Sequence, residues 1–198
     1  PLMARLPDPT DRLDGEDKAL FDRMASARAH AEGRAGLPEV YVRMFNNPAL
    51  AGKVGALGEH IRFHGTLPDE VRELAILRYA VRQGSGYEWS HHQRPAELAG
   101  LSADTIAELT AGDIPATLPD VSRAALRAVD AVAARRSIPA EVQDRLVAAY
   151  GEAGVVELVV LCGLYATMGY VVSAFDIPIE EGLPIPPDSL RSPVRRSL

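Results

Sequence analysis

Two observations predict an all-α fold for this 198-residue chain. The alternation of apolar and polar residues that marks a half-buried strand is nowhere sustained. Prolines and glycines instead divide the chain into segments of helical length, several of which open with a proline or a small polar residue and close at a glycine. Apolar residues make up 47% of the chain and are spread evenly, so a domain of this size can bury a core.

The first half of the chain is expected to hold four helices. The first covers residues 16–32, with Asp14 placed to cap it. A proline opens the second, residues 38–45, and suits that place because the first turn of a helix leaves its N–H groups unpaired. The triplet Asn-Asn-Pro separates it from a third helix over residues 49–65. Another proline opens residues 68–84, where early acids and a late arginine suit the helix dipole.

The second half of the chain is expected to hold five more helical segments. Gly100 closes the first of them, and Ser102 caps the second. The segments are residues 86–94, which extend toward Gly100 beyond a kink or break at Pro95, then 102–112, 120–136, 139–150 and 155–174.

Composition excludes several classes of function. The formal net charge is −6, the pI is near 5.4, and no block of Lys and Arg lies outside the tail, which argues against a nucleic-acid partner. No apolar run approaches the roughly 20 residues that cross a bilayer, and the N-terminal segment lacks the apolar region of a secretory signal. We therefore expect a cytoplasmic protein without a membrane partner. Its one cysteine, Cys162, excludes an internal disulfide.

A glutamate lies in the most apolar of the early helices. Between Val71 and Val81 the apolar side chains extend nearly all round the helix, so this helix is expected to be buried. One turn beyond Glu73, the neighbours are Ile76, Leu77 and Ala80. Burial raises the pKa of a carboxyl group unless a cation or hydrogen bonds offset it, and such a group is a candidate general acid or base. The alternative is a structural ion pair with a nearby Arg or His.

The segment Glu-Trp-Ser-His-His follows one helix later. If it is helical, Glu88 meets His91 and His92 one turn on, and a carboxylate on one imidazole nitrogen leaves the other nitrogen for proton transfer. Trp89 supplies an apolar wall, and Pro95 is expected to kink or break the helix because it lacks an N–H. The alternative is a surface Glu–His pair beside a core tryptophan, with a proline that opens the next turn.

A second pair of histidines has the spacing of metal ligands. His60 and His64 lie one turn apart, but the segment lacks the glutamate of an H-E-x-x-H site and any nearby cysteine. A metal-dependent enzyme that uses this pair with a motif histidine or Glu88 remains an alternative. The two histidines are also candidates to line the same pocket as Glu73.

The stretch from Arg72 to Ser102 resembles the carboxymuconolactone decarboxylase and alkyl hydroperoxidase D (AhpD) superfamily. The shared pattern is a helix with R-E-L-A-I-L, a short glycine-containing turn, then Y-E-W-x-H-H and A-x-x-A-G-L-S. The resemblance covers roughly residues 45 to 110 and implies an all-α, AhpD-like helical bundle in which these two helices pack antiparallel. It also implies a homo-oligomer, a trimer or hexamer, with pockets near the subunit contacts.

The decarboxylase branch of that superfamily needs no metal, organic cofactor or cysteine. The resemblance therefore implies a cofactor-independent lyase (a decarboxylase) or an isomerase, which acts on a small carboxylated lactone or keto acid by acid–base proton transfer. Glu73 is the implied proton shuttle, His92 or His91 the partner imidazole, and Glu88 the orienting carboxylate. The candidate substrate-binding residues are Trp89, Tyr87, Arg78, His64 and His60, with Arg72 and Arg94 as further candidates for a substrate carboxylate.

Other readings of the family remain open. The hydroperoxidase branch carries a C-x-x-C pair in the motif, whereas this motif has no cysteine, so thiol peroxidase activity is not expected. A non-catalytic oligomeric ligand-binding protein is the remaining alternative. We divide the chain into an N-terminal helical extension (residues 1–44), the carboxymuconolactone decarboxylase-like helical domain (45–178) and a Pro-rich tail (179–198). The tail is expected to be disordered or laid across a neighbouring subunit.

Overall fold

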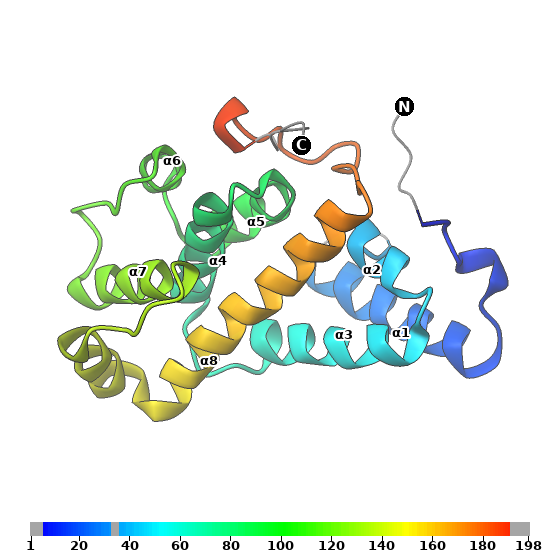
Figure 1. The fold of residues 1–198 in the computed structure, drawn as a ribbon, viewed down its shortest axis with the longest axis horizontal. Helices are drawn as coiled ribbons and strands as arrows, with labels where there is room; N and C mark the ends of the chain where they lie inside the picture. The colour runs from blue at the N-terminus through cyan, green and yellow to red at the C-terminus, as the bar shows by residue number, and fades with distance from the viewer. Residues whose placement is uncertain (1–5, 33–35, 191–198) are drawn as a thin grey trace.

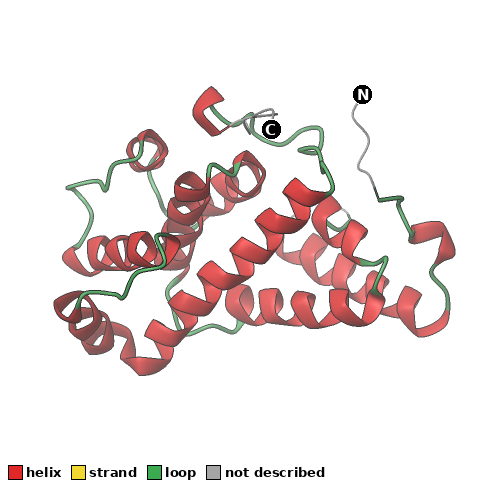
Figure 2. Cartoon of the chain, viewed as in Figure 1, coloured by secondary structure: helices red, strands yellow, loops and turns green. Residues whose placement is uncertain are grey.

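The structure is a computed structural model that describes residues 6–32 and 36–190. Every regular element in these residues is a helix, so the predicted fold class is confirmed (Figure 2). The α-helices are α1 (Gly15–Glu32), α2 (Glu39–Met44), α3 (Pro48–Phe63), α4 (Asp69–Gln83), α5 (Gly86–Leu98), α6 (Ala103–Ala111), α7 (Asp120–Ala133) and α8 (Ala140–Ala174). Two short 3-10 helices, η1 (Thr10–Arg12) and η2 (Asp188–Leu190), lie near the two ends.

Helix α8 runs through the middle of the molecule. In Figure 1 it separates α1, α2 and α3 on one side from α4, α5, α6 and α7 on the other. It packs against α7, α4, α5, α3 and α2, so side chains of α8 join both parts of the core. A second apolar cluster fills the space between α4, α5, α6 and α7. Any site between α4, α5 and α8 therefore lies inside the fold.

Helix α4 is the buried helix that its apolar composition predicts. Each residue of Val71–Ala80 is buried, including Glu73. The helix ends at Gly84, whose left-handed backbone (φ 67°) favours glycine, and the Ser85 N–H donates to the Ala80 carbonyl (2.8 Å) across the turn. Because this turn is so short, α5 runs back along α4, and the motif histidines face the start of α4.

The helix break expected at Pro95 is wrong. Pro95 does not break its helix, because α5 continues through it to Leu98 and loses only one backbone hydrogen bond. The break expected between residues 139–150 and 155–174 is present inside α8 as a kink at Gly151, which adopts the non-helical angles φ 69° and ψ 174°. An 18-residue stretch of α8 has a mean hydropathy of 2.0, so by length and composition alone this helix could cross a membrane, and 33% of that stretch is buried in the fold.

The described part of the tail packs on its own chain. Residues 179–190 return across the start of α5, where Leu190 is buried and its carbonyl lies close to Gly86. A Cβ at Gly86 would approach that carbonyl oxygen to 2.5 Å, so glycine permits the contact. The prediction of a disordered tail is therefore wrong for residues 179–190. Residues 191–198 lie outside the described part.

Candidate active site

Three buried side chains from three helices form one line of hydrogen bonds. His92 of α5 lies between Glu73 of α4 and Tyr165 of α8. Its Nδ1 is 2.8 Å from Glu73 Oε2, and its Nε2 is 2.9 Å from the Tyr165 hydroxyl. The exposed fractions are only 1%, 5% and 7% for Glu73, His92 and Tyr165. We call this line the Glu73–His92–Tyr165 relay.

Burial and the charged groups around the relay determine which of its atoms carry protons. Burial lowers the pKa of His92 below its ordinary 6.5, so the imidazole is neutral near pH 7. Burial alone would raise the pKa of Glu73, but His92 and the guanidinium groups of Arg62 and Arg72 outweigh it and hold that pKa below its usual value. The ionised Glu73 therefore accepts the Nδ1–H of His92, and Nε2 is left to accept the O–H of Tyr165.

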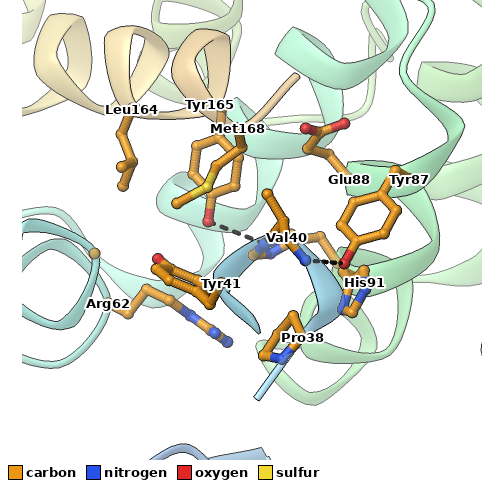
Figure 3. A pocket seen from close by; sticks show the side chains of 12 residues that line it. Pro38, Val40, Tyr41, Arg62, Tyr87, Glu88, His91, Leu164, Tyr165 and Met168 are labelled. Carbon is orange, nitrogen blue, oxygen red and sulfur yellow. Dashed lines mark hydrogen bonds between the residues drawn. The ribbon is translucent and has the colours of Figure 1, made fainter. Parts of the chain in front are cut away.

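The relay ends at a small cavity of about 40 Å³. Figure 3 shows Leu164, Tyr165 and Met168 of α8 along its upper side, Tyr41 and Arg62 beneath, and Glu88 and Tyr87 of α5 to the right. The lining is mainly apolar, with a few polar groups that converge on it, as is usual for small-molecule sites.

A second, wider groove lies beside α5, and Glu73 is among the residues that line it. Its volume is about 970 Å³, and Arg62, Arg72 and Arg94 supply its positive charge. Arg62 and His91 line both hollows. Four acidic residues also line the groove, so its lining carries charges of both signs: Asp69, Glu73, Glu97 and Glu181.

Glu88 does not hold either imidazole, so the predicted orienting contact is wrong. Glu88 is 4% exposed, and neither carboxylate oxygen has a hydrogen-bond partner among the described residues. Its side chain faces α8, where Oε1 lies 3.7 Å from the place a Cβ would take at Gly169. The carboxylates that hold the two histidines come instead from α4 and from the tail. Burial raises the pKa of Glu88 to about 7.

His91 is held by Glu180, a residue that the sequence did not single out. The His91 Nε2 is 2.8 Å from Glu180 Oε2, and the Tyr87 hydroxyl donates to Glu180 Oε1 (2.9 Å). The Glu39 N–H donates to the same oxygen (2.6 Å), and the Val40 N–H donates to the Tyr87 hydroxyl (3.1 Å). One carboxylate thus ties the tail, the start of α2 and the motif helix together beside the cavity.

Removing the charge of Glu180 is expected to destabilise the fold. Burial alone would raise the pKa of Glu180, but His91 and backbone N–H groups lower it to about 2. A carboxyl group with a lowered pKa adds stability above its unfolded value of 4.5, and this stability is lost as pH falls toward 2. We expect Glu180→Gln to cost about 2 kcal/mol at pH 7, after allowance for solvent screening.

Urea unfolding at pH 7, 4 and 3 measures this change. The difference between Glu180→Gln and wild type is expected to shrink as pH falls below 4.5, because Glu180 of the unfolded wild-type chain then takes up a proton while the folded chain keeps it ionised until pH approaches 2. Glu181→Gln, at an exposed neighbouring position, is the matched control and should change little. A difference that stays constant with pH would contradict the charge as its cause.

The structure separates the other predicted site residues from the relay. Trp89 packs in the second apolar cluster, and its Nε1–H donates to the Thr110 hydroxyl (3.0 Å), so the expectation that it walls the pocket is wrong. Arg78 is also misassigned as a substrate ligand. Its guanidinium bonds both oxygens of Asp130 (2.8 and 2.7 Å) and the carbonyls of Gly112 and Asp113, which ties α4 to α7.

The two histidines of α3 lie at its exposed end. His60 and His64 line neither hollow, so their predicted place in the pocket is wrong. Within residues 6–32 and 36–190, no group of three or more His, Cys, Asp or Glu is arranged to hold a metal ion. Cys162 is buried in α8, and burial raises the pKa of its thiol to about 12. A thiol so protonated is a poor nucleophile.

Sequence reasoning missed four residues that complete the site: Tyr165, Glu180, Tyr41 and Arg62. Tyr165 is one of the few polar groups in the mainly apolar second half of α8, a weaker form of the signal that marked Glu73. Tyr41 lies in the N-terminal extension, whose α2 closes one side of the cavity.

Comparison with known proteins agrees with the resemblance seen in the motif. Residues 48–131 match the model of the Carboxymuconolactone decarboxylase family. No curated protein matches the chain by sequence. The fold is similar to that of the debrominase Bmp8, solved alone and, as a cysteine-to-alanine variant, in complex with 2,3,4-tribromopyrrole: each has a TM-score of 0.70 at 20% identity over 85% of this chain and 90% of the other.

A protein of unknown function from Agrobacterium tumefaciens, which its description links to AhpD, also shares the fold. The TM-score is 0.61 at 23% identity, over 69% of this chain and 96% of that chain. These similarities confirm the AhpD-like helical fold.

Proposed function

Because the chain belongs to the carboxymuconolactone decarboxylase and AhpD superfamily, we propose that it is a cofactor-independent lyase or isomerase acting on a small carboxylated lactone or keto acid. A family named for a decarboxylase and a debrominase with the same fold support catalysis in general. The observation that carries the specific proposal is the Glu73–His92–Tyr165 relay, which is fully hydrogen-bonded and ends at a cavity.

The three side chains of the relay act together as a general base, as in a carboxylate–histidine–hydroxyl catalytic triad. Nε2 of the neutral His92 takes the Tyr165 proton as the phenol oxygen removes a proton from a substrate carbon. The ionised Glu73 holds the imidazolium that forms and keeps the ring oriented. Return of the proton from Tyr165 to another carbon completes an isomerisation.

The same relay acts as an acid in a decarboxylation. When CO₂ leaves a β-keto acid or an unsaturated lactone acid, the electrons of the broken C–C bond form an enolate. Tyr165 gives its proton to the enolate carbon and then recovers one from solvent, so the net change is uptake of one proton and release of CO₂. Arg62 lies at the cavity and supplies a positive charge for the substrate carboxylate before it leaves.

Chemistry at thiols does not carry over from the structural neighbours. The motif contains no cysteine, and the one thiol of the chain is buried with a raised pKa. We therefore leave debromination and peroxide reduction outside the proposal. The proposal also includes a homo-oligomer. Helix α8 leaves apolar side chains such as Val156 (62% exposed) in contact with solvent, and the family resemblance implies that a second copy of the chain covers them.

Proton NMR of lactone and β-keto carboxylates in D₂O tests the proposal. Wild-type protein is expected to cause loss of a C–H signal by exchange or the growth of a decarboxylated product. Protein carrying Tyr165→Phe serves as the matched control, since it keeps the fold and lacks the hydroxyl. Equal rates for wild type, Tyr165→Phe and a protein-free sample across the panel would overturn the proposed function.

A further inference from the structure

Glu88 is the one carboxyl group of the cavity that nothing in the described part of the chain engages. It lies on the cavity wall between α5 and α8 and is 4% exposed, and neither of its oxygens has a hydrogen-bond partner among the described residues (Figure 3). Buried polar groups are nearly always paired, because an unpaired one loses its hydration without compensation. A carboxyl group left unpaired on a cavity wall beside the relay is therefore placed to engage a bound molecule.

The surroundings of Glu88 favour its neutral form. No cation within residues 6–32 and 36–190 forms an ion pair with it, and burial raises its pKa to about 7. The titratable groups of the surrounding elements are phenols and already engaged bases: Tyr41 of α2, Arg62 of α3, Tyr79 of α4, Tyr87, His91 and His92 of α5, and Tyr165 of α8. A neutral carboxylic acid has one O–H to donate, and no described group accepts it.

We propose that Glu88 donates a hydrogen bond to a carbonyl oxygen of the bound molecule, so that the site takes small carbonyl compounds. This inference rests on the proposed function and narrows it. The carbonyl lies next to the carbon at which the relay moves a proton. As Tyr165 removes that proton, the C–H electrons form a C=C bond and the carbonyl becomes an enolate oxygen, which the O–H of Glu88 holds.

The same contact serves the decarboxylation, in which the electrons of the C–C bond form the enolate instead. No oxidant or reductant enters either route. The relay and Glu88 thus divide the work between base and acid: Tyr165 exchanges the proton at carbon, and Glu88 stays neutral and binds the developing charge. An ionised Glu88 would repel that charge, so activity requires the protonated form.

Two substitutions separate a donor from a charge. Glu88→Gln keeps an N–H donor of similar size, whereas Glu88→Met fills the space without one. Loss of an oxyanion donor lowers kcat by roughly 10²–10³, and we expect that loss for Glu88→Met, against a loss of about tenfold for Glu88→Gln. Wild-type kcat/KM should fall as pH rises through about 7, and this limb should be absent in Glu88→Gln. Equal losses in the two variants, or none in Glu88→Met, would overturn the proposal.

A binding experiment separates this inference from the proposed function. Difference infrared spectra of 2-cyclopentenone, labelled with ¹³C at the carbonyl, report a hydrogen bond to that oxygen without any turnover. The C=O stretch is expected to move to lower frequency on wild type and on Glu88→Gln, and to stay unshifted on Glu88→Met. If the C=O stretch shifts on wild type but no acid in the NMR panel is turned over, only the proposed reaction is contradicted. An unshifted stretch on wild type sinks the role of Glu88.

Discussion

Replacing Glu73 by Gln is expected to lower kcat by about 10²–10⁴, the range for loss of a general acid–base group. The change preserves the size of the side chain and removes the negative charge 2.8 Å from His92 Nδ1. An amide N–H facing Nδ1 favours the tautomer with the proton on Nε2, and that nitrogen then cannot take the proton of Tyr165. The base is lost although the fold is kept.

Replacing Tyr165 by Phe is expected to cost as much as replacing Glu73, because the two side chains act on the substrate through the same proton. The double variant Glu73→Gln/Tyr165→Phe should therefore lose little more than either single variant. Independent contributions would instead multiply, since distant sites add in free energy. The non-additivity is the signature of a relay.

Steady-state kinetics on the substrate found by NMR measures these losses. KM is expected to change little, as neither side chain supplies binding alone. The acidic limb of the pH profile should lie below 6.5, because burial lowers the pKa of His92. Glu97→Gln, at an exposed carboxylate on α5, is the control and should retain wild-type kcat. Losses that multiply in the double variant would show that Glu73 and Tyr165 act separately.

Local rules predicted most of the helices. Prolines at helix starts and glycines at helix ends gave nearly all boundaries, and the Ser102 hydroxyl caps α6 by accepting the Thr105 N–H (3.1 Å), as expected. The failure was at Pro95, where α5 loses only one backbone hydrogen bond and continues to Leu98. Gly151, in contrast, does interrupt the helical backbone near the predicted boundary.

The sequence predicted Glu73 and His92 of the relay but not Tyr165, and it also missed Glu180. Glu73 stood out because a carboxylate rarely occurs in so apolar a helix, and the short turn at Gly84 placed the motif histidines opposite it. Tyr165 lies 73 positions beyond His92, and Glu180 lies 89 positions beyond His91. Helix periodicity relates only neighbours three or four positions apart, so it offered Glu88 as the partner of both histidines.

The assignment of Glu88 shows why spacing alone misleads. Residues one turn apart share a helix face, but a side chain turns toward whichever surface buries it. Here α8 covers Glu88, while α4 and the tail bring their own carboxylates to the histidines. The positions of α8 and the tail depend on the whole fold, which one helix does not encode.

Replacing Glu88 by Gln is expected to stabilise the folded protein at alkaline pH by about 3 kcal/mol. Burial raises the pKa of Glu88 from 4.5 to about 7, so the folded state holds this proton more tightly than the unfolded state. For a raised pKa, the stabilising contribution is complete below pH 4.5 and is lost as pH rises through about 7. Gln carries no such proton, and its free energy of unfolding keeps the value of the neutral form.

Urea unfolding of wild type and Glu88→Gln between pH 4 and 9 measures the difference. It should be small at pH 4, grow through the interval from 4.5 to about 7, and level off above it. This course is opposite in sign to that of Glu180→Gln, which destabilises and does so most at neutral pH, so a general effect of removing acidic charge cannot produce both. Glu97→Gln should track wild type within about 0.5 kcal/mol at each pH. A Glu88→Gln protein no more stable than wild type at pH 9 would mean that Glu88 ionises freely, and a freely ionised carboxylate could not donate to a carbonyl oxygen.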